Sequence, residues 1–107
     1  MESLDAILDV PGLTGVYIGP SDLGFSYGLV PILDREEPEI LAIYEKVLAA
    51  CKKRGLYAGI HCGSAGYAAK AIKMGFMLVT ISNDSGIMAV AAKAAVKQVR
   101  TEAAAHV

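Results

Sequence analysis

The chain has 107 residues, of which 54% are hydrophobic and 20% are charged. This composition supplies enough apolar side chain for one buried core and excludes an intrinsically disordered chain. Ten basic and eleven acidic residues, interspersed along the sequence, give a net charge of −1. No basic region is present to hold nucleic acid or an anionic membrane surface, and we expect neither partner.

The apolar stretches and the cysteines indicate the compartment. Gly, Lys or Asp interrupts the longest apolar stretches well short of the roughly 20 residues that a membrane span needs, and acidic rather than basic residues follow Met1. Cys51 and Cys62 belong to no CxxC pair and no Cys/His metal spacing, which predicts free thiols. The expectation is a soluble, cytoplasmic protein.

Helical and strand-like patterns alternate along the chain. Helices are predicted at residues 3–8, 38–54, 64–74 and about 85–102, with a frayed tail at 103–107. Short apolar runs with the pattern of buried strands occupy residues 15–19, 56–60 and 77–81. Residues 19–37 contain prolines and glycines without a sustained period, which predicts a long functional loop.

The alternating order predicts an α/β fold with a parallel sheet joined by right-handed crossovers. Three parallel strands cannot close a barrel, which typically takes about 250 residues. Residues 1–107 are therefore interpreted as a single partial domain with open sheet edges and one uncovered apolar face. A doubly wound nucleotide-binding domain is disfavoured because no G-x-G-x-x-G follows the first strand.

In parallel α/β proteins, ligands bind at the carboxyl ends of the strands. Three polar segments are predicted there, at residues 19–23, 61–64 and 82–84. Asp22 in the first segment is suited to bind a divalent cation while loop amides hold an anionic ligand. A helix cap or a turn is the alternative role for this Ser-Asp pair.

The other two segments offer further candidates. His61 is suited to act as an acid, a base or a hydrogen-bond donor, with a structural histidine that donates to a carbonyl as the alternative. Cys62 is expected in packing, because nothing nearby in sequence favours a thiolate. Ser64 is expected to cap a helix rather than to help bind phosphate after Gly63, and Asp84 is expected to cap the last helix rather than to line the cavity.

The segment from Asp9 to Leu23 reads D-V-P-G-L-T-G-V-Y-I-G-P-S-D-L. It resembles the HpcH/HpaI aldolase (citrate lyase beta-like) family, whose signature has the form V-x-G-V-D-G-V-F-I-G-P-x-D-L. Weaker similarity continues through Gly28, the helix after Pro38 and the two later strands, so it covers nearly the whole chain. The resemblance implies the C-terminal portion of a TIM (β/α)8 barrel, about strands six to eight with their helices.

The resemblance also implies roles for the first polar segment. In the family, the matching Asp is one of two carboxylates that hold Mg²⁺ or Mn²⁺, and neighbouring amides receive the pyruvate carboxylate. Asp22 would then be a metal ligand, and Gly19, Pro20, Ser21 and Asp22 would bind substrate. His61 departs from the apolar residue frequent at that position, and it is the candidate catalytic and aldehyde-binding residue.

The implied activity is that of a class II aldolase, which reversibly cleaves a 4-hydroxy-2-oxoacid to pyruvate and an aldehyde. The family's other metal carboxylate, its carboxylate-binding Arg and its catalytic His have no counterpart here, and Glu2 lies downstream of the metal Glu position. The resemblance further implies a homo-oligomer, commonly a hexamer, with the last helix on a neighbouring subunit. The alternatives are an acyl-CoA lyase of the citrate or malyl type, and a catalytically inactive barrel fragment that acts only in assembly.

Overall fold

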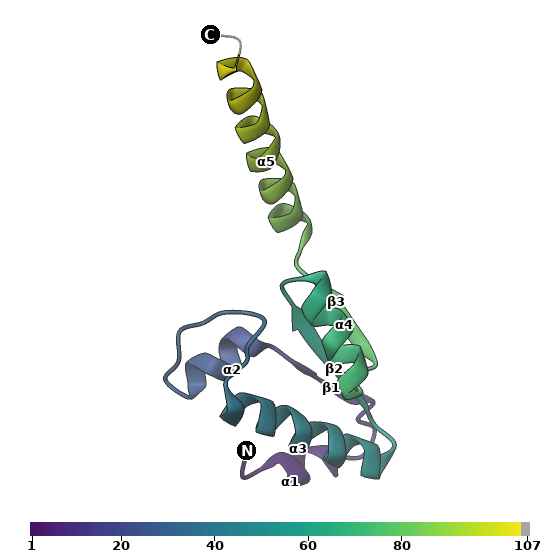
Figure 1. Cartoon of the computed structure of the whole chain (residues 1–107). Coiled ribbons are helices and arrows are strands. Elements are labelled where there is room, and N and C mark those ends of the chain that lie inside the picture. Colours follow the sequence, from purple (N-terminus) through teal and green to yellow (C-terminus); the bar gives the residue numbers. More distant parts are fainter. Residues whose placement is uncertain (106–107) are drawn as a thin grey trace.

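The structure, a computed structural model, describes residues 1–105 as five helices and one three-stranded sheet (Figure 1). In chain order, the elements are α1 (Leu4–Leu8), β1 (Gly15–Ile18), α2 (Pro20–Ser26), α3 (Pro38–Arg54), β2 (Tyr57–Cys62), α4 (Ala65–Met74), β3 (Leu78–Ile81) and α5 (Asp84–Ala104). The strands are parallel in the order β1-β2-β3. The predicted alternation and the parallel sheet are therefore confirmed.

The core lies between one face of the sheet and the helices α3 and α4. On β2, every second side chain faces these helices, and Ile60 is fully buried there. Helix α3 contributes Ile40 and Tyr44, which are also fully buried. The ring of Tyr44 meets Phe76 edge-on, with ring centroids 5.9 Å apart. Burial of these side chains away from water is the main force that holds α3 and α4 on the sheet.

The ends of α3 and α4 follow from local sequence. Helix α3 begins with Pro38 at a position that needs no N–H, and it ends at Gly55, whose φ of 67° favours glycine. Helix α4 begins after Ser64, whose Oγ accepts a hydrogen bond from the N–H of Tyr67 at 3.2 Å, and it ends at Gly75. The predicted cap at Ser64 is confirmed.

The prediction that Asp84 caps the last helix is wrong. The cap of α5 is Asn83, whose side-chain oxygen accepts from the N–H of Gly86 at 2.6 Å. A capping residue needs an extended backbone, and Asn83 has φ −148° and ψ 169°. Asp84 is instead the first helical residue, and its Oδ1 accepts a hydrogen bond from the N–H of Ser85 at 2.7 Å.

Three predicted boundaries also differ from the structure. Residues 19–37 are predicted to be a loop, but α2 lies within them. Its seven residues are too few to show a helical period in the sequence. Strand β2 continues through His61 and Cys62, which pair with β3. Helix α5 runs to Ala104, so the predicted tail is partly helical, and residues 106–107 lie outside the described residues.

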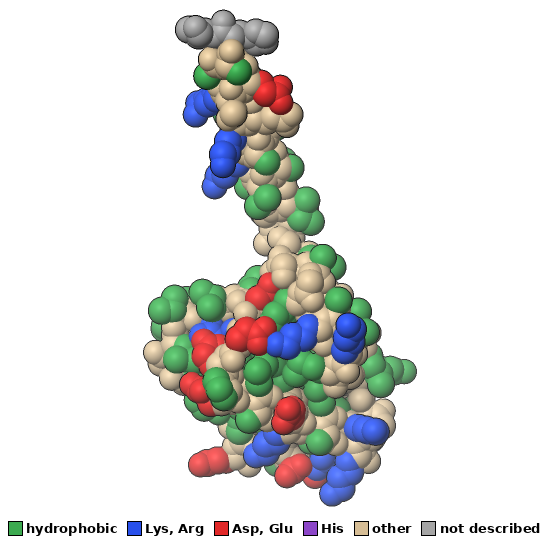
Figure 2. Space-filling view, in the orientation of Figure 1, with side chains coloured by type: hydrophobic (Ala, Val, Ile, Leu, Met, Phe, Trp, Pro, Cys, Tyr) green, Lys and Arg blue, Asp and Glu red, His purple; other side chains and the backbone are tan. Residues whose placement is uncertain are grey.

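The opposite face of the sheet is uncovered, as predicted. It carries Tyr17, Tyr57 and Leu78, of which 49%, 58% and 57% respectively are exposed. Helix α5 extends away from the body (Figure 1), and the structure describes no buried residue on it. Hydrophobic side chains are visible along this helix in Figure 2. Both surfaces are of the kind that other protein normally covers.

Within residues 1–105, the helices all fall short of the length and apolar character that a membrane span requires.

The packing at Gly24 in α2 generates a prediction. A Cβ at this position would lie 2.4 Å from Cζ of the buried Arg35, so Gly24→Ala must displace that guanidinium. We expect the free energy of unfolding, measured by urea denaturation, to fall by about 1–3 kcal/mol. The matched control is Gly66→Ala in α4, where nothing lies within 4 Å of the new methyl group. It should raise the free energy of unfolding by about 0.5 kcal/mol, because alanine favours the helix. Equal effects of the two substitutions would contradict the packing described here.

Candidate active site

The three predicted polar segments lie at one edge of the sheet, because all three strands are parallel. Strand β1 leads directly into α2, which carries Asp22 in its first turn. Strand β2 carries His61 close to its carboxyl end, and β3 leads through Asn83 to Asp84. Asp22, His61 and Asp84 therefore share the edge at which ligands bind in this type of sheet.

Asp22 is exposed and does not cap a helix. The cap of α2 is Gly19, and the first hydrogen bond of the helix runs from the N–H of Leu23 to the Gly19 carbonyl at 2.9 Å. The predicted alternative of a cap or a turn at Ser21-Asp22 is therefore wrong. A Cβ on Gly19 would lie 3.6 Å from Oδ2 of Asp22, which places the carboxylate beside the Gly19 backbone.

The amides of Ser21 and Asp22 come before the first hydrogen bond within α2. The amide groups at the start of a helix have no partner inside the helix, and Pro20 has no N–H to leave unpaired. The segment therefore presents two N–H groups and one carboxylate within three residues. Such a combination suits a ligand that has both a carboxylate group and a bound divalent cation.

Asp22 fits a metal site as one ligand among several. Mg²⁺ prefers about six oxygen ligands, several of which are commonly water or substrate. Residues 1–105 contain no group of three His, Cys, Asp or Glu side chains that could together hold a metal ion. The exposed Asp22 carboxylate can therefore serve a site whose other ligands are supplied by substrate, water or further polypeptide.

His61 takes part in a hydrogen-bonded chain of side chains that crosses the sheet. It lies directly opposite Thr80 of β3, and its Nδ1 is 2.7 Å from the Thr80 Oγ1. The same oxygen is hydrogen-bonded to the hydroxyl group of Tyr17 on β1. Among the described residues, the partner of the His61 ring is thus a side-chain hydroxyl rather than the carbonyl expected for a structural histidine.

Cys62 is a buried free thiol, as predicted. Burial raises the pKa of this thiol, and the nearby Asp34 carboxylate raises it further. Because the thiolate is the reactive form, a raised pKa makes Cys62 a poor nucleophile. Its side chain contributes to the core instead.

Asp34 joins the loop between α2 and α3 to the start of α4. Its Oδ1 accepts from the N–H of Gly63 and its Oδ2 accepts from the hydroxyl of Ser64, both at 2.7 Å. The residue has φ 52°, a conformation that few residues other than glycine, Asn and Asp adopt. Asp34 therefore places a negative charge beside Gly63 and the Ser64 hydroxyl, and this charge disfavours the alternative of phosphate binding at the start of α4.

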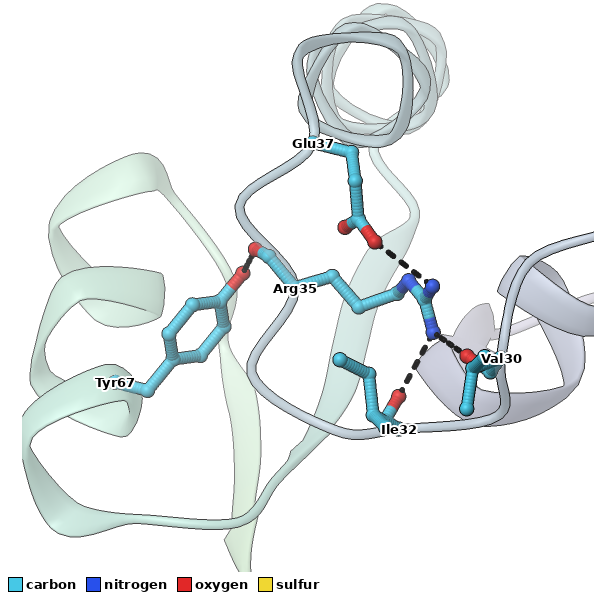
Figure 3. Close-up of polar contacts among 5 residues, drawn as sticks. All are labelled: Val30, Ile32, Arg35, Glu37 and Tyr67. Carbon is cyan, nitrogen blue, oxygen red and sulfur yellow. Dashed lines mark hydrogen bonds and ion pairs between the residues drawn. The ribbon is translucent and has the colours of Figure 1, made fainter.

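The buried guanidinium of Arg35 holds the same loop in shape (Figure 3). Its Nη1 donates to the carbonyls of Val30 at 2.7 Å and Ile32 at 3.2 Å, and its Nη2 donates to Oε1 of Glu37 at 2.8 Å. The hydroxyl of Tyr67 donates to the Arg35 carbonyl. A buried cation that lost these partners would be strongly destabilising, so these contacts favour the loop conformation seen here. Nε of Arg35 and Oε2 of Glu37 are buried without a hydrogen-bond partner among the described residues.

Sequence reasoning missed Tyr17, Asp34, Arg35 and Thr80. The period-two alternation of the strands could have placed positions 17, 61 and 80 on one face, once the pairing of β2 with β3 was known. The contacts of Asp34 and Arg35 left no pattern in the sequence, because they depend on how the loop folds back onto Gly63 and Gly24.

The chain is similar in sequence to known proteins. No family model matches the sequence. The chain is 35% identical over 100 residues to a hydroxypyruvate/pyruvate aldolase of Rhizorhabdus wittichii, covering 94% of this chain and 40% of that protein. It is 32% identical over 94 residues to a 4-hydroxy-2-oxo-heptane-1,7-dioate aldolase of Escherichia coli, covering 88% of this chain and 35% of the relative.

Two solved structures resemble the fold. The chain superposes with a TM-score of 0.83 on an HpcH/HpaI aldolase/citrate lyase family protein of Burkholderia cenocepacia, at 30% identity over 92% of this chain. In sequence and in fold, the chain matches part of an HpcH/HpaI protein. An HpcH/HpaI aldolase of Desulfitobacterium hafniense gives the same TM-score of 0.83 at 28% identity.

The match covers only part of each HpcH/HpaI protein. The chain spans 38% of both solved structures and 35–40% of the two curated relatives. The predicted fold class, a portion of a barrel with parallel strands, is therefore confirmed. Its position as strands six to eight stays a prediction.

The contact between Asp34 and the start of α4 can be tested. Asp34→Ala removes two hydrogen bonds, and we expect it to lower the free energy of unfolding by about 1–3 kcal/mol and to speed hydrogen exchange at the N–H of Gly63. Asp34→Asn keeps an oxygen for that N–H and tolerates the left-handed conformation, so it should lose less stability. Unchanged exchange at Gly63 in Asp34→Ala would show that the contact is absent in solution.

Proposed function

We propose that the chain is one partial domain of an HpcH/HpaI aldolase and supplies part of an active site that reversibly cleaves a 4-hydroxy-2-oxoacid to pyruvate and an aldehyde. The observation that carries this proposal is the position of Asp22. It lies in the Gly-Pro-Ser-Asp-Leu segment at the carboxyl edge of the sheet, in a chain whose curated relatives are named as aldolases of this type.

In this proposal, Asp22 is one carboxylate ligand of Mg²⁺ or Mn²⁺. Such an ion, when chelated by a 2-oxoacid, stabilises the enolate that forms when the carbon–carbon bond breaks. The N–H groups of Ser21 and Asp22 receive the substrate carboxylate. Gly19 leaves the space beside the Asp22 carboxylate free, and the buried Pro20 sets the start of α2.

His61 is proposed as the catalytic residue of this chain and as a contact of the aldehyde. It is half-buried near the carboxyl end of β2, the strand that pairs with the one leading into Asp22. Its polar ring suits an aldehyde or hydroxyl oxygen better than the apolar residue frequent in the family would. A change in aldehyde preference is the expected consequence.

Two further parts of the proposal concern assembly and location. The projecting α5, on which the structure describes no buried residue, supports a homo-oligomer, with the hexamer as the form that the resemblance implies. The buried free thiols Cys51 and Cys62 support a reducing, cytoplasmic location. Of the alternatives, the acyl-CoA lyase has less support because both named curated relatives are aldolases.

A hybrid barrel tests the function. In it, this chain replaces the matching segment of the Rhizorhabdus wittichii aldolase. We expect Mg²⁺- or Mn²⁺-dependent release of pyruvate from a 4-hydroxy-2-oxoacid, and Asp22→Asn should lower kcat/KM at least about 100-fold because the metal loses a charged ligand. The matched control Glu45→Gln, on the exposed surface of α3, should leave kcat/KM unchanged.

Two other outcomes would count against the proposal. A folded hybrid without activity would favour the fragment that acts only in assembly. Equal activity of the hybrid and its Asp22→Asn variant would remove Asp22 from the metal site.

His61→Leu in the hybrid should change the ratio of kcat/KM values between a polar and an apolar aldehyde, and an unchanged ratio would remove His61 from the aldehyde site.

A further inference from the structure

Tyr17, His61 and Thr80 come from three different strands and form one hydrogen-bonded chain. The two contacts are the Tyr17 hydroxyl with the Thr80 Oγ1, and that oxygen with Nδ1 of His61 at 2.7 Å. Thr80 and His61 are direct neighbours across β2 and β3, whereas Tyr17 is on the far strand. The side chain of Tyr17 must therefore cross β2 to reach Thr80.

Gly59 makes that crossing possible. It is the direct neighbour of Tyr17 across β1 and β2, and it lies two residues before His61 on the same face. A Cβ at Gly59 would approach Cδ2 of Tyr17 to 2.8 Å, so the ring lies over the glycine backbone. The absence of a side chain at position 59 thus gives the Tyr17 hydroxyl its path to β3.

The available protons favour one direction of donation along the hydrogen bonds between Tyr17, Thr80 and His61. The Thr80 hydroxyl has a single proton, and Nδ1 of a neutral imidazole either donates or accepts. If Tyr17 donates to Thr80 and the Thr80 proton points to Nδ1, the ring proton of His61 is on Nε2. If Thr80 Oγ1 instead accepts from both Tyr17 and Nδ1–H, its own proton has no partner among the described residues. The reverse direction would use a phenol as acceptor, although a phenol is a better donor than an aliphatic hydroxyl. The first direction is therefore favoured.

We propose that Tyr17 and Thr80 are positioning residues that hold neutral His61 in the tautomer with its proton on Nε2. Among the described residues, the His61 ring is hydrogen-bonded only through Nδ1. Nε2–H is then the ring donor left for a ligand. The benefit to catalysis rests on the proposed function, in which this N–H donates to the carbonyl oxygen of the aldehyde and polarises it.

The tautomer can be measured without any enzyme activity. The chain contains only two histidines, so ¹⁵N-labelled protein gives a simple imidazole spectrum in which His61→Asn identifies the His61 signals. We expect the Nε2–H tautomer in the unmodified chain. Thr80→Val, which removes the hydroxyl at nearly constant shape, should lower the ratio of Nε2–H to Nδ1–H at least about fivefold. Thr80→Ser should restore it.

Matched substitutions separate this effect from a general change in packing. Tyr17→Phe keeps the ring over Gly59 and should lower the ratio in the same direction as Thr80→Val. Thr14→Val and Tyr27→Phe make the same chemical changes at exposed positions and should leave it unchanged. If the chain alone does not remain monodisperse, the spectra are recorded on the hybrid barrel, with the His61 signals again identified by their loss in His61→Asn.

The outcomes distinguish this inference from the aldolase proposal. An Nδ1–H tautomer in the unmodified chain, or no response to Thr80→Val, would overturn the positioning role even if the hybrid barrel is active. A response to Thr80→Val that Thr80→Ser reverses would support the role even if the hybrid has no activity. In an active hybrid, Thr80→Val should reduce kcat/KM for the aldehyde reaction, and Thr80→Ser should recover it.

Discussion

The central strand β2 is the element on which the rest of the structure depends. It pairs in parallel with β1 on one side and with β3 on the other. Since side chains alternate along a strand, this pairing sends Ile60 into the core and His61 to the opposite face. A shift of one residue would exchange the two faces. The buried core and the candidate site are therefore determined by the same set of backbone hydrogen bonds.

The loop between α2 and α3 is the second organised feature. Its shape depends on a buried guanidinium and a carboxylate in an unusual backbone conformation, which together reach α2, α4 and the end of β2. Both arrangements cost free energy by themselves, and the hydrogen bonds that Arg35 and Asp34 make offset part of that cost. A rigid loop beside the carboxyl edge suits a site in which the groups that bind substrate must be held in place.

The uncovered surfaces connect the fold to the proposed function. One sheet face is open, α5 extends from the body, and the chain spans about two fifths of the named relatives. In a complete barrel, the open face would point to the interior and meet side chains from the other strands. The same face carries the hydrogen-bonded side chains of Tyr17, Thr80 and His61. Thus the surface that is unfavourable in isolation is also the one that carries polar side chains near the site.

The sequence by itself determined the α/β order, the parallel sheet and the caps at Ser64 and Gly55, and it identified Asp22 as a candidate site residue. Each of these depends on neighbouring residues or on a short motif. It also placed His61 at the correct edge. Only the tertiary structure decided that Asn83 rather than Asp84 caps α5, that Asp34 reaches Gly63, and that Tyr17 reaches Thr80 across Gly59. The contacts of Asp34 and Tyr17 join residues 29 to 63 positions apart, and such pairs become visible only when the strand register and the path of the loop are known.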